Sequence, residues 1–158
     1  VPSLPNMVSE GIEVPEASDF SHVMRELASA VLVKGPPCWQ ALEVDNSRYA
    51  ITEILDDLYE PRSRAEQIAS ATVLFDQLAN HFLRSRQLWS AKGKTIPRRL
   101  RAVDFEFAVR FEESFQELFA TGHTAQVIAL AEEVLERSGG RLLGGHKLAA
   151  PLDWRQVL

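Results

Sequence analysis

The chain has 158 residues, 46% hydrophobic and 25% charged, and this length and composition predict one domain with a buried core. Its net charge of −5 argues against a protein that coats nucleic acid. No stretch has the pattern of a transmembrane helix or of a secretory signal, so we expect a cytoplasmic protein with no membrane partner. The single cysteine, Cys38, excludes an internal disulfide and a cysteine-based zinc cluster.

Residues 1–18 hold Pro2, Pro5 and Pro15 and show little periodicity, which predicts an extended arm or linker. We expect residues 19–158 to form a single helical bundle domain.

Within that domain, five segments have apolar residues spaced by three and four, the period of a helix with one buried face. The predicted helices cover residues 19–33, 47–59, 63–89, 105–121 and 124–138. The longest begins with a capping box of Ser63 and Glu66, and at 1.5 Å per residue it would be about 40 Å long. The sequence therefore predicts an all-α fold, an up-and-down bundle of about five helices arranged around this long one.

The last segment, residues 141–158, has few charges and several large apolar residues, including Leu148, Leu152, Trp154 and Val157. We expect this apolar tail to pack along the bundle or against a partner.

A basic segment follows the longest predicted helix and contains no Asp or Glu between its first and last cation. Its members are Arg84, Arg86, Lys92, Lys94, Arg98, Arg99 and Arg101. One interpretation is a solvated helix end whose cations complement the helix dipole.

The other interpretation is a site for phosphate or carboxylate at the turn. Lysine and arginine bind such oxygens strongly, and a tryptophan face can stack on a ring. The candidate anion-binding residues are Trp89, Lys92, Lys94, Arg98 and Arg99.

Two acidic groups and one histidine beside the apolar stripe of the longest predicted helix have plainer interpretations. The acidic groups, Glu53, Asp56 and Asp57, and Glu112, Glu113 and Glu117, predict solvated helix faces, because no histidine lies at ligand spacing. No metal site is therefore expected. His81 lies in the longest predicted helix, and we expect a hydrogen-bonded or partly exposed residue there.

Several short motifs together carry a family resemblance over roughly residues 30–145. They are Leu32-x2-Gly35-Pro36-Pro37, Trp89-x3-Gly93-Lys94, Arg98-Arg99-Leu100 and Leu130-Ala131-x2-Val134-Leu135-x3-Gly139-Gly140. This pattern resembles the C-terminal helical domain of nucleotidyltransferases of the DNA polymerase β superfamily, including aminoglycoside-modifying members. The resemblance implies an up-and-down bundle that closes over a nucleotide and an acceptor substrate.

The catalytic motif of that family, a Gly-Ser followed by paired aspartates, does not occur in this sequence. The resemblance therefore implies a substrate-binding domain or subunit that is not catalytic alone and has no cofactor of its own. Its partners would be a nucleotidyltransferase catalytic domain and a small anionic ligand or nucleotide, with Mg²⁺ bound together with the nucleotide.

Two further hypotheses come from other classes of protein. In the first, the chain is a non-enzymatic interaction module whose apolar tail and Phe-rich segment 105–121 form a homodimer interface. In the second, Arg141 and His146 have the Arg-x4-His spacing of helical ribonucleases of the HEPN group. Gly144 and Gly145 lie between them and favour a loop there instead of the helix that such a site requires.

Overall fold

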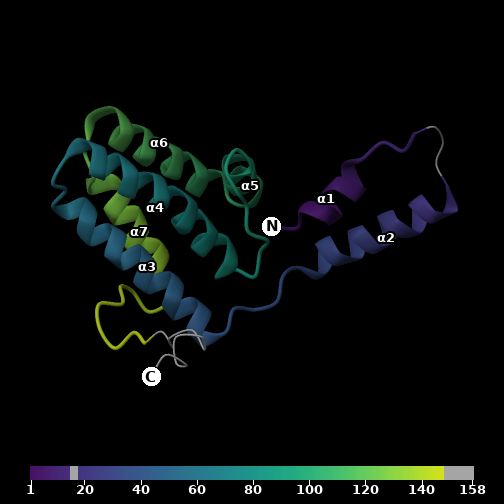
Figure 1. The fold of residues 1–158 in the computed structure, drawn as a ribbon, viewed down its shortest axis with the longest axis horizontal. Coiled ribbons are helices and arrows are strands. Elements are labelled where there is room, and N and C mark those ends of the chain that lie inside the picture. Colours follow the sequence, from purple (N-terminus) through teal and green to yellow (C-terminus); the bar gives the residue numbers. More distant parts are fainter. Residues whose placement is uncertain (15–17, 148–158) are drawn as a thin grey trace, which may run out of the picture.

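The computed structural model describes residues 1–14 and 18–147, and within these ranges helices joined by loops are the only regular secondary structure (Figure 1). This confirms the all-α prediction, although the described residues form seven helices and not about five. The helices are α1 (Ser3–Glu10), α2 (Asp19–Lys34), α3 (Ala41–Tyr59), α4 (Arg64–Arg84), α5 (Thr95–Val103), α6 (Phe105–Thr121) and α7 (Ala125–Glu136).

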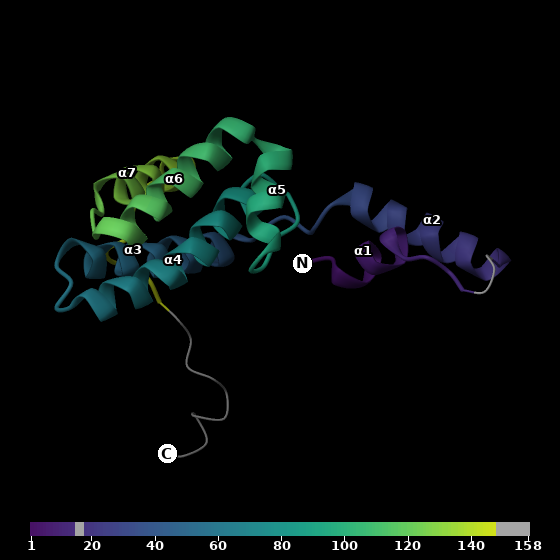
Figure 2. The same cartoon turned by 90° about the horizontal axis from the view of Figure 1, so that it is seen from above.

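Helix α4 is the centre of a bundle, as the longest apolar pattern predicts. It packs against α3, α5, α6 and α7 (Figures 1 and 2). The Ser63 hydroxyl caps its start by accepting a hydrogen bond from the Glu66 amide at 3.2 Å, which confirms this half of the predicted capping box.

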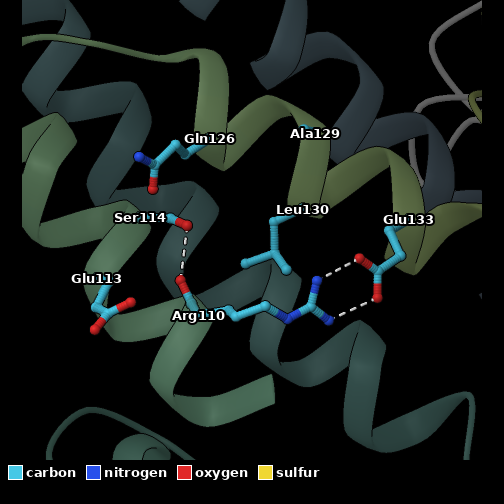
Figure 3. A pocket seen from close by; sticks show the side chains of 7 residues that line it. All are labelled: Arg110, Glu113, Ser114, Gln126, Ala129, Leu130 and Glu133. Atoms are coloured by element: carbon cyan, nitrogen blue, oxygen red, sulfur yellow. Dashed lines mark hydrogen bonds and ion pairs between the residues drawn. The ribbon is translucent and has the colours of Figure 1, made fainter. Parts of the chain in front are cut away.

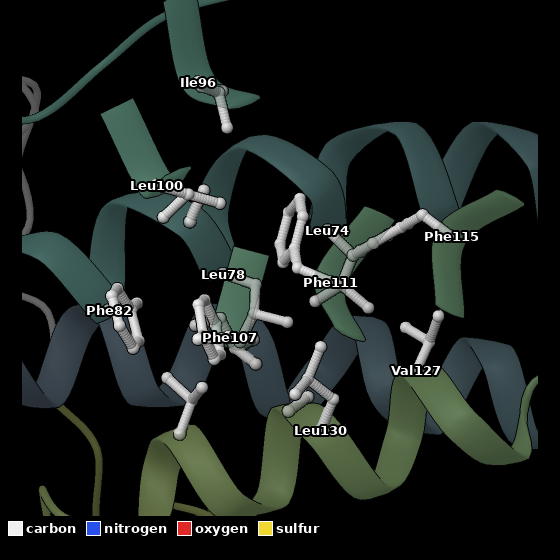
Figure 4. Packing of buried hydrophobic residues seen from close by; sticks show 14 of the residues in the cluster. Leu74, Leu78, Phe82, Ile96, Leu100, Phe107, Phe111, Phe115, Val127 and Leu130 are labelled. Atoms are coloured by element: carbon white, nitrogen blue, oxygen red, sulfur yellow. The ribbon is translucent and has the colours of Figure 1, made fainter. Parts of the chain in front are cut away.

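The bundle core is built from aliphatic and phenylalanine side chains of α3–α7 (Figure 4). Phe82 of α4 stacks on Phe107 of α6 with ring centroids 3.7 Å apart. Phe111 and Phe115 are also buried, and both contact Phe75 of α4. Three of the five phenylalanines of this helix are therefore core, whereas Phe105 and Phe119 are exposed.

The prediction of an extended N-terminal arm is wrong for residues 3–10, which form α1 and pack against α2. Pro2 and Pro5 do not prevent the helix, because Pro2 is its N-cap and Pro5 lies in its first turn. The amides of the first turn have no intrahelical acceptor, so a proline there removes no helix hydrogen bond. Helices α1 and α2 form a hairpin that extends away from the bundle, and neither packs against any helix of α3–α7 (Figures 1 and 2).

Two predicted helix boundaries are also wrong. Helix α3 begins six residues before position 47, because Gln40 and Glu43 form a capping box in which the Gln40 amide donates to Glu43 Oε2 at 2.8 Å. Helix α4 ends at Arg84, five residues before Trp89. The last part of the basic segment then lies in α5, whose buried Ile96 and Leu100 hold it on the bundle.

The segment after α7 lies along α3 as far as it is described. The amide of Leu142 donates to Thr52 Oγ1 at 3.0 Å, and Arg141 pairs with Asp56. The remaining tail residues, 148–158, lie outside the described residues. In the described ranges, none of the helices combines the length and hydropathy that crossing a membrane requires.

Candidate anion-binding site

The structure separates the members of the basic segment. Lys92, Lys94 and Arg98 are exposed at the α4–α5 turn and on α5. Arg101 donates two hydrogen bonds to the carboxylate of Glu112, at 2.8 and 2.5 Å, so its charge is already paired.

Two of the five predicted binding residues, Trp89 and Arg99, line one hollow of about 280 Å³ together with Pro2 and Leu32. The indole N–H of Trp89 donates to the carbonyl oxygen of Leu32 at 3.2 Å. This contact joins the loop after α4 to the end of α2. Trp89 therefore helps to attach the N-terminal hairpin to the bundle, and its N–H is not free for a ligand.

A larger hollow of about 490 Å³ lies at the other side of the end of α4. Its walls carry three arginines, Arg84, Arg86 and Arg137, beside Trp39 and Ser138. No Asp or Glu is among its described lining residues. We call this hollow, with its three arginines, the arginine pocket.

The end of α4 positions two of these arginines. The amide of Leu88 donates to Leu83 O and that of Gln87 to Arg84 O, both at 3.0 Å, which closes the helix in a Schellman turn. Gln87 takes the left-handed conformation that this turn requires, with φ of 58°. The chain reverses there, and Arg84 and Arg86 come to lie on the wall of the pocket.

The third arginine comes from the turn after α7. Arg48 of α3 donates to the carbonyl oxygens of Gly139 and Gly140 at 2.8 and 2.9 Å. These bonds hold the turn against α3 and place Arg137 and Ser138 opposite the end of α4.

The guanidinium of Arg84 is only partly satisfied. Its Nη2 donates to Pro37 O at 2.7 Å, and the group lies 5.4 Å from the centroid of the Trp39 ring. Its Nη1 is buried and has no hydrogen-bond partner among the described residues. A buried donor without a partner costs free energy, and an anion in the pocket would offset the charge of this guanidinium.

Arg86 lies in an environment that disfavours its charge. Burial lowers the pKa of Arg86, and the like charge of Arg137 lowers it further, while the more weakly acting Asp104 and Glu133 raise it. Both carboxylates have other partners: Glu133 pairs with Arg110, and Asp104 caps α6. An anion between Arg86 and Arg137 would be stabilised by both guanidinium groups.

A buried polar chain runs beneath the pocket. His81 is fully buried, with Nδ1 2.8 Å from Ser47 Oγ and Nε2 2.9 Å from Ser138 Oγ. Burial, and then the charges of Arg48 and Arg86, lower the pKa of His81 to about 4, so the ring is neutral at pH 7. The prediction of a hydrogen-bonded helix residue is confirmed, and the histidine links two elements that shape the pocket.

A third hollow, between α6 and α7, offers no comparable site (Figure 3). Arg110 and Glu133 neutralise each other there through two hydrogen bonds of 2.7 and 2.8 Å, and Ser114 donates to Arg110 O. The described residues also hold no group of three or more His, Cys, Asp or Glu arranged to bind a metal ion.

The arginine and histidine of the ribonuclease hypothesis lie in a non-helical segment, as the paired glycines predict. Arg141 contacts Asp56 and the ring of Tyr59, whereas His146 stacks on Tyr49 with centroids 4.4 Å apart. The α3 residues that Arg141 contacts are about 10–15 Å along the helix axis from the one that His146 contacts. They do not support a shared catalytic site.

In comparisons with known proteins, no family model, no curated protein and no solved structure matches this chain. The resemblance to a nucleotidyltransferase helical domain therefore stays a prediction. Arg137 and Trp39 were missed as candidates because each is far from the basic segment in the chain. The one signal for Arg137 is its place directly before the Ser-Gly-Gly turn that ends the last predicted helix.

Proposed function

We propose that this chain is a helical anion-binding module and that the arginine pocket is its binding site. The observation that carries this proposal is the meeting of three arginines in one hollow without a carboxylate in its described lining. Unbalanced positive charge at close range is costly to fold, and an anionic ligand offsets that cost when it binds.

The ligand is proposed to be a phosphate-bearing molecule of nucleotide size. Arginine forks match the oxygens of a phosphate group, and Ser138 adds a hydroxyl to the same wall. The hollow of about 490 Å³ is in the size range of small-molecule sites and exceeds what inorganic phosphate needs. Such a ligand would fit the substrate-binding role that the nucleotidyltransferase resemblance implies.

Isothermal titration calorimetry with ATP, and separately with inorganic pyrophosphate, tests the proposal. We expect Arg137→Gln to weaken binding by about tenfold or more, since it removes one charged hydrogen-bonding partner. The matched control is Arg98→Gln, because Arg98 is an exposed arginine outside the pocket. Arg137 is itself exposed, so its replacement should leave the helical content unchanged.

The same titration separates this pocket from the turn that the sequence predicts. If Lys94→Ala and Arg98→Ala weaken ATP binding and Arg137→Gln does not, the site is the α4–α5 turn. Absence of binding to both ATP and pyrophosphate at low salt would overturn the proposal of an anion site in either place.

A further inference from the structure

The N-terminal hairpin has an apolar face that nothing in the described structure covers. On α2, Phe20, Val23 and Leu27 are 73%, 60% and 58% exposed and follow one another by three and four residues. A different stripe of α2, with Met24 and Ala28, is the one turned toward α1. Among the described residues, helix α2 therefore has two apolar stripes and only one helical partner.

Helix α1 extends this face. Leu4 and Met7 are exposed one turn apart, and Met7 lines a groove of about 320 Å³ together with Phe20 and Met24. We call the five residues Leu4, Met7, Phe20, Val23 and Leu27 the hairpin face. Large exposed apolar faces of this kind mark interaction surfaces.

The charges of the hairpin argue against a lipid surface as the occupant. Residues 1–34 contain five acidic residues and two basic ones, counted from Glu10, Glu13, Glu16, Asp19 and Glu26 against Arg25 and Lys34. Helices that lie on anionic membranes are instead rich in lysine and arginine on their polar side.

The pattern of apolar and charged residues along α2 is complementary to the same pattern in a second α2 that runs in the opposite direction. An antiparallel pair with its two-fold axis at Leu27 sets Leu27 against Leu27 and Val23 against Val31. It also sets Phe20 against Lys34 of the second copy, and so brings Asp19, next to Phe20, near the Lys34 ammonium. Opposite charges thus meet at both ends, and the helix dipoles are antiparallel.

We propose that the hairpin face binds the same face of a second copy, so that two α1–α2 hairpins form a four-helix interface. A helix of 16 residues is about 24 Å long, and two helices side by side are about 20 Å wide. The surface area that such a face buries is at the lower end of the range for specific interfaces, so we expect the dimer to dissociate on dilution.

Sedimentation equilibrium of the full chain over a range of micromolar concentrations tests the dimer. The expected result is a dimer that dissociates on dilution. In Leu27→Glu the dissociation constant of the dimer should rise at least tenfold. Val73→Glu is the matched control, since Val73 is an exposed valine on α4, away from the hairpin. A monomer at every concentration, or a dimer that Leu27→Glu leaves intact, overturns the proposal.

A disulfide test fixes the arrangement of the two copies. In a Cys38→Ala background, Leu27→Cys lies at the two-fold axis and should form a covalent dimer under mild oxidation. Phe20→Cys should not, because the two positions would be about 21 Å apart in an antiparallel pair. Cross-linking at residue 20, or none at residue 27, overturns the antiparallel arrangement.

Discussion

At the scale of single residues, His81 shows how a polar group is accommodated in an apolar helix face. It is fully buried, yet both ring nitrogens have a serine partner, Ser47 on one side and Ser138 on the other. A satisfied polar group of this kind costs little and fixes the relative position of the elements that it joins. The histidine thereby ties α4 to α3 and to the turn after α7.

This burial makes a prediction about acid. The folded protein holds His81 neutral with a pKa of about 4, whereas the unfolded chain takes up a proton near 6.5. The unfolded state therefore binds more protons between these two pH values, and stability falls as the pH falls through that window. The loss should reach about 3 kcal/mol of the free energy of unfolding at pH 4. Urea denaturation between pH 7 and pH 4 measures it.

The variant His81→Gln keeps hydrogen-bonding capacity and cannot titrate, so it should lose clearly less stability over the same window. His22→Gln is the control, because His22 is exposed on α2. Equal pH slopes in wild type and His81→Gln would contradict the assignment.

At the scale of elements, the end of α4 decides where the arginines lie. The Schellman turn ends the helix at Arg84 although the apolar pattern continues to Trp89. Gln87 occupies the left-handed position of this turn, where glycine is the usual residue. Gly122 occupies the equivalent position at the end of α6, with φ of 88°.

The two turns predict opposite effects of exchanging glycine. Gln87→Gly should raise the free energy of unfolding by about 0.5–1 kcal/mol, because it removes the strain of a side chain at positive φ. Gly122→Ala should lower it by about 1 kcal/mol or more, since it adds that strain and brings a Cβ to 3.1 Å from Gln67 Oε1. Chemical denaturation measures both, and a destabilised Gln87→Gly would show that the side chain itself stabilises the turn.

At the scale of the whole molecule, the chain consists of a bundle and a hairpin joined at few points. The core residues belong to α3–α7 and the α4–α5 loop. The hairpin is held by contacts such as Trp89 to Leu32, and Arg84 to Pro37 just beyond the hairpin. Stability should therefore reside almost entirely in the bundle.

Deletion of residues 1–34 tests this division. The shortened chain should still unfold cooperatively, with a loss of about 1–2 kcal/mol and a slightly smaller dependence on urea, because the hairpin buries little surface. It should also be monomeric if the hairpin face is the dimer interface. Circular dichroism during urea denaturation, with sedimentation of the same sample, checks both, and a broad transition without cooperativity would contradict the division.

The local pattern predicted well wherever a helix is long and has one continuous apolar face. Helix α6 is the clearest case, since its Phe107, Phe111 and Phe115 are buried together. Helix α1 was missed because a segment of eight residues that includes a proline shows no apolar period. Helix α5 was missed because it has only two buried apolar residues, Ile96 and Leu100, and its other positions are largely cationic or exposed.

The candidate site was predictable only as a type of chemistry. A run of cations without carboxylates predicted an anion site, but the structure disperses five of its seven cations and keeps Arg84 and Arg86 together. The third arginine, Arg137, joins them only because Arg48 holds the turn after α7 against α3.

The sequence by itself determined the helical class, the central helix and most of the core, because apolar periodicity is a local property of each segment. Tertiary structure alone decided which cations meet at the arginine pocket, which apolar stripe stays bare on α2, and that His81 is satisfied on both sides. Those outcomes depend on contacts between segments far apart in the chain, and no local pattern encodes which of them will be neighbours.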